Sequence, residues 1–199
     1  DGGLKIVVFQ DAAGVSELIL TRPPAYRPEH YARGFRLQTV RDGRRENKIC
    51  GLKTLNYLDC LVAKRAAQAA GCDEALFVDS GGRVLEGSTS NVFVVKDGAV
   101  LTPALDQGIL PGIARSRVLQ LLAKENVREG VVPTPLLFEA DEVFVTNSLL
   151  GVMPVARIDE RGYDRAANPV TKSIMGTYRA LELQTGDEHV IGPRSRSNA

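Results

Sequence analysis

Short runs of β-branched and aromatic residues, separated by turn-forming residues, dominate the first half of the chain. Such runs are typical of strands in hairpins. The predicted strands in this half are 5–9, 17–20, 34–40, 74–78, 83–86, 91–95 and 99–102. Asp97-Gly98 predicts a tight hairpin turn, and 41–45 reads as another turn. Three prolines within 23–28 predict an irregular linker.

Helical spacing of apolar residues predicts three helices, over 56–70, 113–126 and 169–183. On the first, the positions that recur on one face are Leu58, Leu61, Val62, Ala66 and Ala69. Gly71 ends that helix. The segments 141–146 and 152–155 are predicted strands, joined by a loop over 147–151. Hairpins interspersed with helices predict an α+β fold.

The charge, the apolar stretches and the cysteines of the chain argue against several classes of function. The 199 residues carry 25 Lys+Arg and 24 Asp+Glu, a net charge of +1, which argues against a nucleic-acid binder. No apolar stretch approaches the length of a membrane span. Cys50, Cys60 and Cys72 are odd in number and widely spaced, which predicts neither a metal site nor a disulfide framework. A reduced, cytoplasmic location and a small-molecule substrate are expected.

Two residues in the first half could carry chemistry. Lys53 lies between Leu52 and Leu55 ahead of a predicted helix, where desolvation would lower the pKa of its amine and favour covalent catalysis. It could equally be a surface lysine. Glu86 ends a predicted strand before the small residues 87–90, which allow close approach of a ligand. Its alternative is an exposed glutamate in a plain turn.

Two later segments could bind an anion. Gly112 precedes a predicted helix, so the free N–H groups of Gly112, Ile113 and Ala114 would point at a phosphate. The alternative is that Pro111-Gly112 only begins the helix. In the loop after the strand 141–146, Ser148 and its backbone could donate to the same anion. That loop could also cap itself as a turn.

Taken in chain order, these four segments resemble the class IV aminotransferase family, the fold-type IV pyridoxal-phosphate enzymes. The resemblance covers 34–183 and implies pyridoxal 5'-phosphate as cofactor, a homodimer, and a pseudo-barrel cofactor domain that follows a smaller α/β domain. It divides the chain into 1–45, the C-terminal part of the smaller domain, 46–190, the cofactor domain, and 191–199, a flexible tail. Fewer residues precede Lys53 than in the family, so an upstream part of the smaller domain is expected to be absent.

The resemblance also implies roles for individual residues. Lys53 would form the lysine aldimine and move protons, Glu86 would pair with the pyridine nitrogen, and Tyr57 would lie near the phenolic oxygen. The other residues implied at the cofactor site are Ser88, Thr89, Gly112, Ile113, Ala114, Asn147 and Ser148. Of these, the backbone amides of 113 and 114 and the Ser148 hydroxyl would hold the phosphate.

Within the family, 146–155 is most similar to 4-amino-4-deoxychorismate lyase, in which an asparagine follows the strand as Asn147 does here. The family's aminotransferases often carry a glutamate where Gly151 stands. The resemblance therefore favours the lyase, which forms 4-aminobenzoate and pyruvate in folate biosynthesis. Because 53–57 and 86–91 are as close to aminotransferases, a branched-chain or D-amino-acid aminotransferase is an alternative. A truncated, non-catalytic family member is another.

Overall fold

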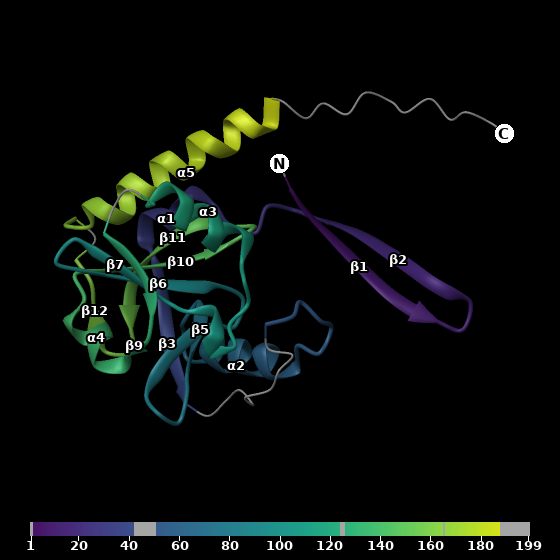
Figure 1. The fold of residues 1–199 in the computed structure, drawn as a ribbon. Coiled ribbons are helices and arrows are strands. Elements are labelled where there is room, and N and C mark those ends of the chain that lie inside the picture. Colours follow the sequence, from purple (N-terminus) through teal and green to yellow (C-terminus); the bar gives the residue numbers. More distant parts are fainter. Residues whose placement is uncertain (1, 42–50, 124–125, 165, 188–199) are drawn as a thin grey trace.

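A curved sheet of ten strands forms the body of the protein, seen in a computed structural model that describes residues 2–41, 51–123, 126–164 and 166–187 (Figure 1). In the order in which they lie side by side, the strands are β8 (Val127–Gly130), β7 (Ala99–Pro103), β6 (Asn91–Lys96), β10 (Glu142–Asn147), β11 (Gly151–Ile158), β3 (Phe35–Arg41), β4 (Glu74–Val78), β5 (Arg83–Gly87) and β9 (Val132–Pro133), while β12 (Arg161–Gly162) also pairs with β11.

The sheet curves round its main core. Strands β5 and β9, at one end of the strand order, also contact β7 near the other end. Val84, Val92, Val145 and Met153 come from four strands and belong to one buried cluster. A sheet that encloses its own core in this way resembles a barrel. The α+β class and the barrel-like cofactor fold predicted from the sequence are therefore confirmed.

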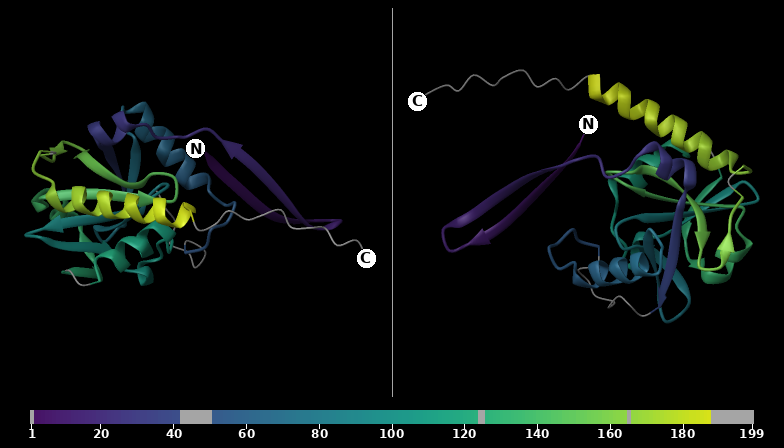
Figure 2. Two further views of the ribbon diagram at one scale, coloured as in Figure 1. Left: turned by 90° about the horizontal axis from the view of Figure 1, so that it is seen from above. Right: turned by 180° about the vertical axis from the view of Figure 1, so that it is seen from behind.

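Helices cover the outside of the sheet (Figures 1 and 2). They are α1 (Pro28–Arg33), α2 (Leu58–Ala69), the 3₁₀ turn η1 (Leu105–Gln107), α3 (Ile113–Leu121), α4 (Thr134–Glu139) and α5 (Pro169–Asp187). Helices α3 and α5 pack against each other and against β10, over the stacked rings of Phe93 and Phe144, whose centroids are 4.8 Å apart. In the described part of the chain, no helix is long and apolar enough to cross a membrane.

The predicted strands and helices are all found, with shifted ends. The extended piece predicted at 152–155 is part of the longer β11, and the helix predicted at 113–126 ends at Leu121. The predicted linker contains the start of α1, and α4 was not predicted because six residues are too few to show a helical period. The turn predicted at 41–45 lies almost wholly outside the described residues. Strand β3, which the resemblance grouped with 1–45, is hydrogen-bonded on both sides within the large sheet.

A separate hairpin extends away from the body. Its strands β1 (Gly3–Asp11) and β2 (Gly14–Arg22) pair only with each other in the described structure, and the ribbon projects into solvent in every view (Figures 1 and 2). At its base, Gly3 lies beside the side chain of Leu149. Large apolar side chains of the hairpin are exposed, Ile6 by 59% and Val15 by 74%. The predicted strands 5–9 and 17–20 are thus confirmed as a pair that has no core of its own.

One ion pair ties α1 to the connection between α2 and β4. The Asp73 carboxylate accepts two hydrogen bonds from the Arg33 guanidinium, at 2.8 and 2.7 Å, and one from the backbone N–H of Arg36 at 2.8 Å. Burial alone would raise the pKa of Asp73, but the hydrogen bonds from Arg33 and Arg36 outweigh it and lower the pKa below its ordinary value. The folded state therefore favours the charged carboxylate.

We expect Asp73→Asn to lower the free energy of unfolding by about 1–2 kcal/mol near neutral pH. Because the pKa is lower in the folded state, the contribution is complete above the unfolded pKa and is lost as the pH falls through the folded pKa. Urea unfolding of the wild type and of Asp73→Asn should therefore show a difference in the free energy of unfolding that narrows as the pH falls from about 5 to about 3. A difference that stays constant across this range would contradict a role for the charge.

Candidate active site

Glu86 lies at the end of β5 and is held in one position by two donors. It is 7% exposed, and its Oε2 accepts a hydrogen bond from the backbone N–H of Leu110 at 2.9 Å and from Asn91 Nδ2 at 3.2 Å. Asn91, the first residue of β6, also donates to the Leu110 carbonyl at 2.9 Å. The carboxylate is therefore not an exposed turn glutamate. It is a buried acceptor fixed between two strands and the segment before α3.

The start of α3 is bound into the same arrangement. Gly112 is the N-cap residue of this helix, and its backbone packs directly on Asn91 Oδ1. Among the described residues, the N-cap position supplies no side-chain hydrogen bond, so the first-turn amides of Ile113 and Ala114 can donate to an outside acceptor. Together with the helix dipole they favour an anion at this end. Two of the sequence-predicted segments, Glu86 and 112–114, are thus brought together.

Gly112→Ala is expected to weaken this arrangement. An added Cβ would overlap Asn91 Oδ1, and Asn91 cannot turn away without giving up its bonds to Glu86 and Leu110. Overpacking of this kind costs about 1–3 kcal/mol. Thermal or urea unfolding should show this loss of stability.

Gly176→Ala is the matched control, because nothing lies within 4 Å of the Cβ it would add to the exposed side of α5. This variant should be as stable as the wild type or more stable by up to about 1 kcal/mol, the gain from alanine in a helix. Equal stability of the two variants would contradict the close packing of Gly112 on Asn91.

Lys53 lies on the surface, just before α2. Its Nζ is 5.4 Å from the centre of the Tyr57 ring, a cation–π contact. The prediction that Leu52 and Leu55 would desolvate this lysine is wrong in this structure, because both are exposed, by 59% and 66%. The neighbouring face of α2 is exposed as well, so no apolar layer covers the amine. Tyr57 itself is half-buried and supplies the residue before α2.

The lysine segment nevertheless passes beside the Glu86 site. A Cβ at Gly51 would stand 3.6 Å from the carbonyl oxygen of Ile109, a buried residue next to Leu110. Among the described residues, no hydrogen bond or ion pair joins Lys53 to Glu86. The structure therefore brings the two segments side by side, while the Lys53 amine lies against the Tyr57 ring.

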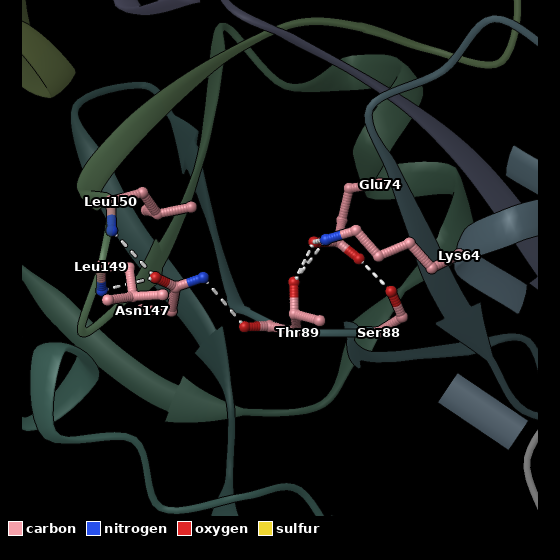
Figure 3. A network of polar contacts seen from close by, with 7 residues as sticks. All are labelled: Lys64, Glu74, Ser88, Thr89, Asn147, Leu149 and Leu150. Carbon is pink, nitrogen blue, oxygen red and sulfur yellow. Dashed lines mark hydrogen bonds and ion pairs between the residues drawn. The ribbon is translucent and has the colours of Figure 1, made fainter. Parts of the chain in front are cut away.

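The loop after β10 is organised by Asn147. Its Oδ1 accepts hydrogen bonds from the backbone N–H groups of Leu149 and Leu150, at 2.8 and 2.9 Å, and its Nδ2 donates to the Thr89 carbonyl at 3.0 Å (Figure 3). The loop thus caps itself, as the alternative interpretation predicted. Both polar atoms of the Asn147 side chain thus bind within the protein, while Ser148 is exposed beside it.

The hydroxyls of Ser88 and Thr89 both point to one carboxylate, that of Glu74 (Figure 3). The Ser88 hydroxyl donates to Oε1, and the Thr89 hydroxyl donates to Oε2 at 2.6 Å. Lys64 Nζ lies 3.0 Å from the Thr89 hydroxyl and 3.5 Å from Glu74 Oε2. The hydroxyls of Ser88 and Thr89 are thus already hydrogen-bonded within the protein. A direct role of these two residues at the cofactor stays a prediction.

Glu74 and Lys64 are functional candidates that the sequence analysis missed. The available signal was a glutamate at the start of an otherwise apolar strand, in a position that the sheet buries completely. Lys64 gave no signal, because a lysine on a helix is ordinary and its partner is far along the chain. Only the folded arrangement joins them.

Comparison with known proteins adds independent information. A family model described as class IV amino-transferase matches residues 2–158. A Thermotoga maritima protein named as a branched-chain-amino-acid aminotransferase is 38% identical over 144 residues, which are 71% of this chain and 52% of that protein. The chain spans about half the length of the curated relatives it matches.

Solved structures agree in fold. A Legionella pneumophila protein described as 4-amino-4-deoxychorismate lyase is 28% identical with a TM-score of 0.78, over 90% of this chain and 69% of that one. The branched-chain amino acid aminotransferase of Thermobaculum terrenum in its PLP-form is 28% identical with a TM-score of 0.76, over 87% of this chain and 61% of that one. Both similarities extend well beyond the individual motifs.

Proposed function

Because the chain belongs to the class IV aminotransferase family, whose members use pyridoxal phosphate, we propose that it forms the cofactor-binding part of an enzyme acting on an amino-bearing acid. When bound, pyridoxal phosphate supplies an electron sink for the carbon next to the substrate amine. The observation that carries the proposal is the fixed, buried Glu86 beside the uncapped start of α3.

The residues present fit this cofactor. A buried carboxylate that accepts from two N–H donors suits a protonated ring nitrogen. The first-turn amides at 113 and 114, which no N-cap side chain binds within the described residues, and the exposed Ser148 hydroxyl suit a phosphate. Thr146 pairs with Asn91 across β10 and β6, and among the described residues its buried Oγ1 has no hydrogen-bond partner, as expected of a group that a ligand satisfies.

Each residue then has a separate task. Glu86 would hold a proton on the ring nitrogen. The hydrogen bonds from Leu110 and Asn91 keep its carboxylate in one position. The α3 start and Ser148 anchor the phosphate, which fixes orientation while bonds change elsewhere. Lys53 Nζ would hold the cofactor, and once the substrate amine has displaced it, the freed Nζ would take the proton from the substrate carbon that bears the amine.

For the finer activity, we propose 4-amino-4-deoxychorismate lyase, which gives 4-aminobenzoate, a folate precursor, and pyruvate. The support comes from Gly151, where the family's aminotransferases often carry a glutamate. Gly151 has φ +61°, and a Cβ there would stand 3.1 Å from the Tyr178 ring. A glutamate here would strain the backbone and require the Tyr178 ring to move by a few tenths of an ångström, which favours glycine at this position in this chain.

A branched-chain or D-amino-acid aminotransferase is the second candidate, favoured by the name of the Thermotoga relative. Product assays of the purified chain loaded with pyridoxal phosphate distinguish the two activities. Supplied with 4-amino-4-deoxychorismate, a lyase releases pyruvate and 4-aminobenzoate. Supplied with an L- or D-amino acid and 2-oxoglutarate, an aminotransferase forms glutamate. Cofactor binding without either product would favour a non-catalytic family member.

We also propose a cytoplasmic homodimer. The support is an exposed apolar surface that begins at the lysine segment and continues along α2. Its residues are Leu52, Leu55, Leu58, Leu61 and Val62, each at least 50% exposed. Contact with a second copy of the chain would cover this surface and desolvate Lys53. Sedimentation should show a dimer for the wild type and a weakened dimer for Leu58→Glu. A monomeric wild type would contradict the proposed dimer.

A further inference from the structure

Glu74 is a buried charge that the proposed chemistry does not use. It is the first residue of β4 and is completely buried. A buried carboxylate is costly unless donors surround it, and here both oxygens accept hydrogen bonds from hydroxyls of the same turn. Lys64, from α2, completes the set at 3.5 Å from Oε2. This set of polar contacts at the buried start of a strand suggests that Glu74 has a function.

The hydrogen bonds have only one consistent direction. Lys64 can donate but not accept, and the Thr89 hydroxyl has a single proton. That proton goes to Glu74 Oε2 at 2.6 Å, so the lone pair of the hydroxyl accepts from Lys64 Nζ at 3.0 Å. The Thr89 side chain is therefore locked between a helix and a strand. Loss of charge at either end would free it.

The turn that Glu74 holds directly follows Glu86. Gly87 N–H donates to the Ser90 carbonyl at 2.7 Å, and Ser88 N–H donates to the Ala75 carbonyl at 2.9 Å. A Cβ at Gly87 would stand 3.3 Å from Glu74 Cγ, so the turn lies directly on the Glu74 side chain. Movement of Glu74 would thus be transmitted to the end of β5.

The same turn reaches the loop that carries Ser148. The Thr89 carbonyl accepts from Asn147 Nδ2, and Asn147 Oδ1 in turn holds the amides of Leu149 and Leu150 (Figure 3). A continuous set of contacts therefore runs from α2 through Glu74 and Thr89 to the 147–150 loop. It joins the helix that follows Lys53, the turn that follows Glu86 and the loop of Ser148.

We propose that Glu74, with Lys64, is a positioning residue that sets the distance between Glu86 and the 147–150 loop. The inference rests on the proposed function, because that distance matters only to a ligand that touches both. Glu74 itself touches no ligand. It acts through Thr89 and Asn147, and its loss leaves every proposed cofactor contact chemically present but less well placed.

The test compares Glu74→Gln with Glu142→Gln in the full chain. Glu142 is a matched control, because it is 3% exposed, starts β10, and accepts hydrogen bonds with both oxygens, from the N–H groups of Val170 and Thr171. Two quantities are measured: hydrogen exchange of the Leu149 and Leu150 amides without cofactor, and the Kd for pyridoxal phosphate.

We expect Glu74→Gln to speed exchange of these two amides and to weaken pyridoxal phosphate binding, each by about 10-fold to 100-fold. Glu142→Gln should lose stability but change neither quantity beyond about 2-fold relative to the wild type. Equal effects of the two variants, or unchanged exchange at Leu149 and Leu150 in Glu74→Gln, would overturn the proposal. Should the wild type fail to bind the cofactor, the proposed function falls while the exchange comparison still decides this inference.

Lys64 supplies a second, milder test if Glu74→Gln does not fold. Lys64→Met keeps the carboxylate and both hydroxyl bonds but removes the charge that holds Thr89. It should reproduce the faster exchange, and Lys64→Arg should restore the wild-type rate because it keeps a donor and a positive charge. The same exchange rate in Lys64→Met and the wild type would contradict the role of Lys64.

Discussion

Replacing Lys53 with alanine is expected to abolish turnover, lowering it by about 10³-fold or more, together with the visible absorption of the bound cofactor. Alanine has no amine to carry the cofactor and none to take the proton from the substrate carbon. The fold should be unaffected, because Lys53 is exposed and its contact is a cation–π interaction with Tyr57. Absorption spectra and initial rates of the loaded chain measure both effects.

The control for this prediction is Lys5→Ala. Lys5 is an exposed lysine on β1, opposite Leu20 of β2, so its removal should leave absorption and rate unchanged. Persistence of the visible band in Lys53→Ala would show that another amine carries the cofactor. That result would remove Lys53 from the mechanism without disturbing the assignment of Glu86.

Loss of the Glu86 carboxylate is expected to have the second large effect. Glu86→Ala should keep the visible absorption, because Lys53 is intact, yet slow turnover by about 10³-fold, since nothing then holds a proton on the ring nitrogen. Alanine also leaves the Leu110 N–H and Asn91 Nδ2 without their buried acceptor. A loss of stability of about 1–3 kcal/mol should accompany the kinetic effect.

Glu86→Gln separates these two consequences. The glutamine oxygen can still accept from Leu110 N–H, so unfolding should be close to that of the wild type, but the side chain carries no charge. We expect its turnover to fall nearly as far as that of Glu86→Ala. Rates near the wild-type value in a stable Glu86→Gln protein would refute the role of the charge.

Sequence reasoning was most successful where the signal is local. The strands between Glu74 and Pro103 follow from short apolar runs and from Asp97-Gly98, whose positive φ angles of 50° and 75° suit a hairpin turn. Glu86 and Gly112 are predicted as site residues because a residue type, a spacing and a strand or helix end coincide, and the structure places their segments side by side. Their proximity was then implied by the order of the segments in the family.

Long-range contacts were beyond the same reasoning. Ser88 and Thr89 look like ligand hydroxyls in a small-residue turn, but both donate hydrogen bonds to Glu74, which is 14 residues from Ser88 along the chain. Asn147 looks like a ligand amide, but its Nδ2 donates a hydrogen bond to the carbonyl of Thr89, which is 58 residues away along the chain. The exposure of Lys53 could not be predicted either, because it depends on what packs over 52–62 rather than on neighbours in sequence.

The β1–β2 hairpin has a practical consequence for work with this chain. Both of its edges present unpaired backbone groups in the described structure, and apolar side chains such as Ile6 and Val15 face water. A ribbon of this kind is a template on which strands of other molecules add, so purified material is expected to become turbid as it is concentrated. Replacing Ile6 and Ile19 with lysine would give a cleaner sample for crystallisation and would keep Gly3 in place beside Leu149.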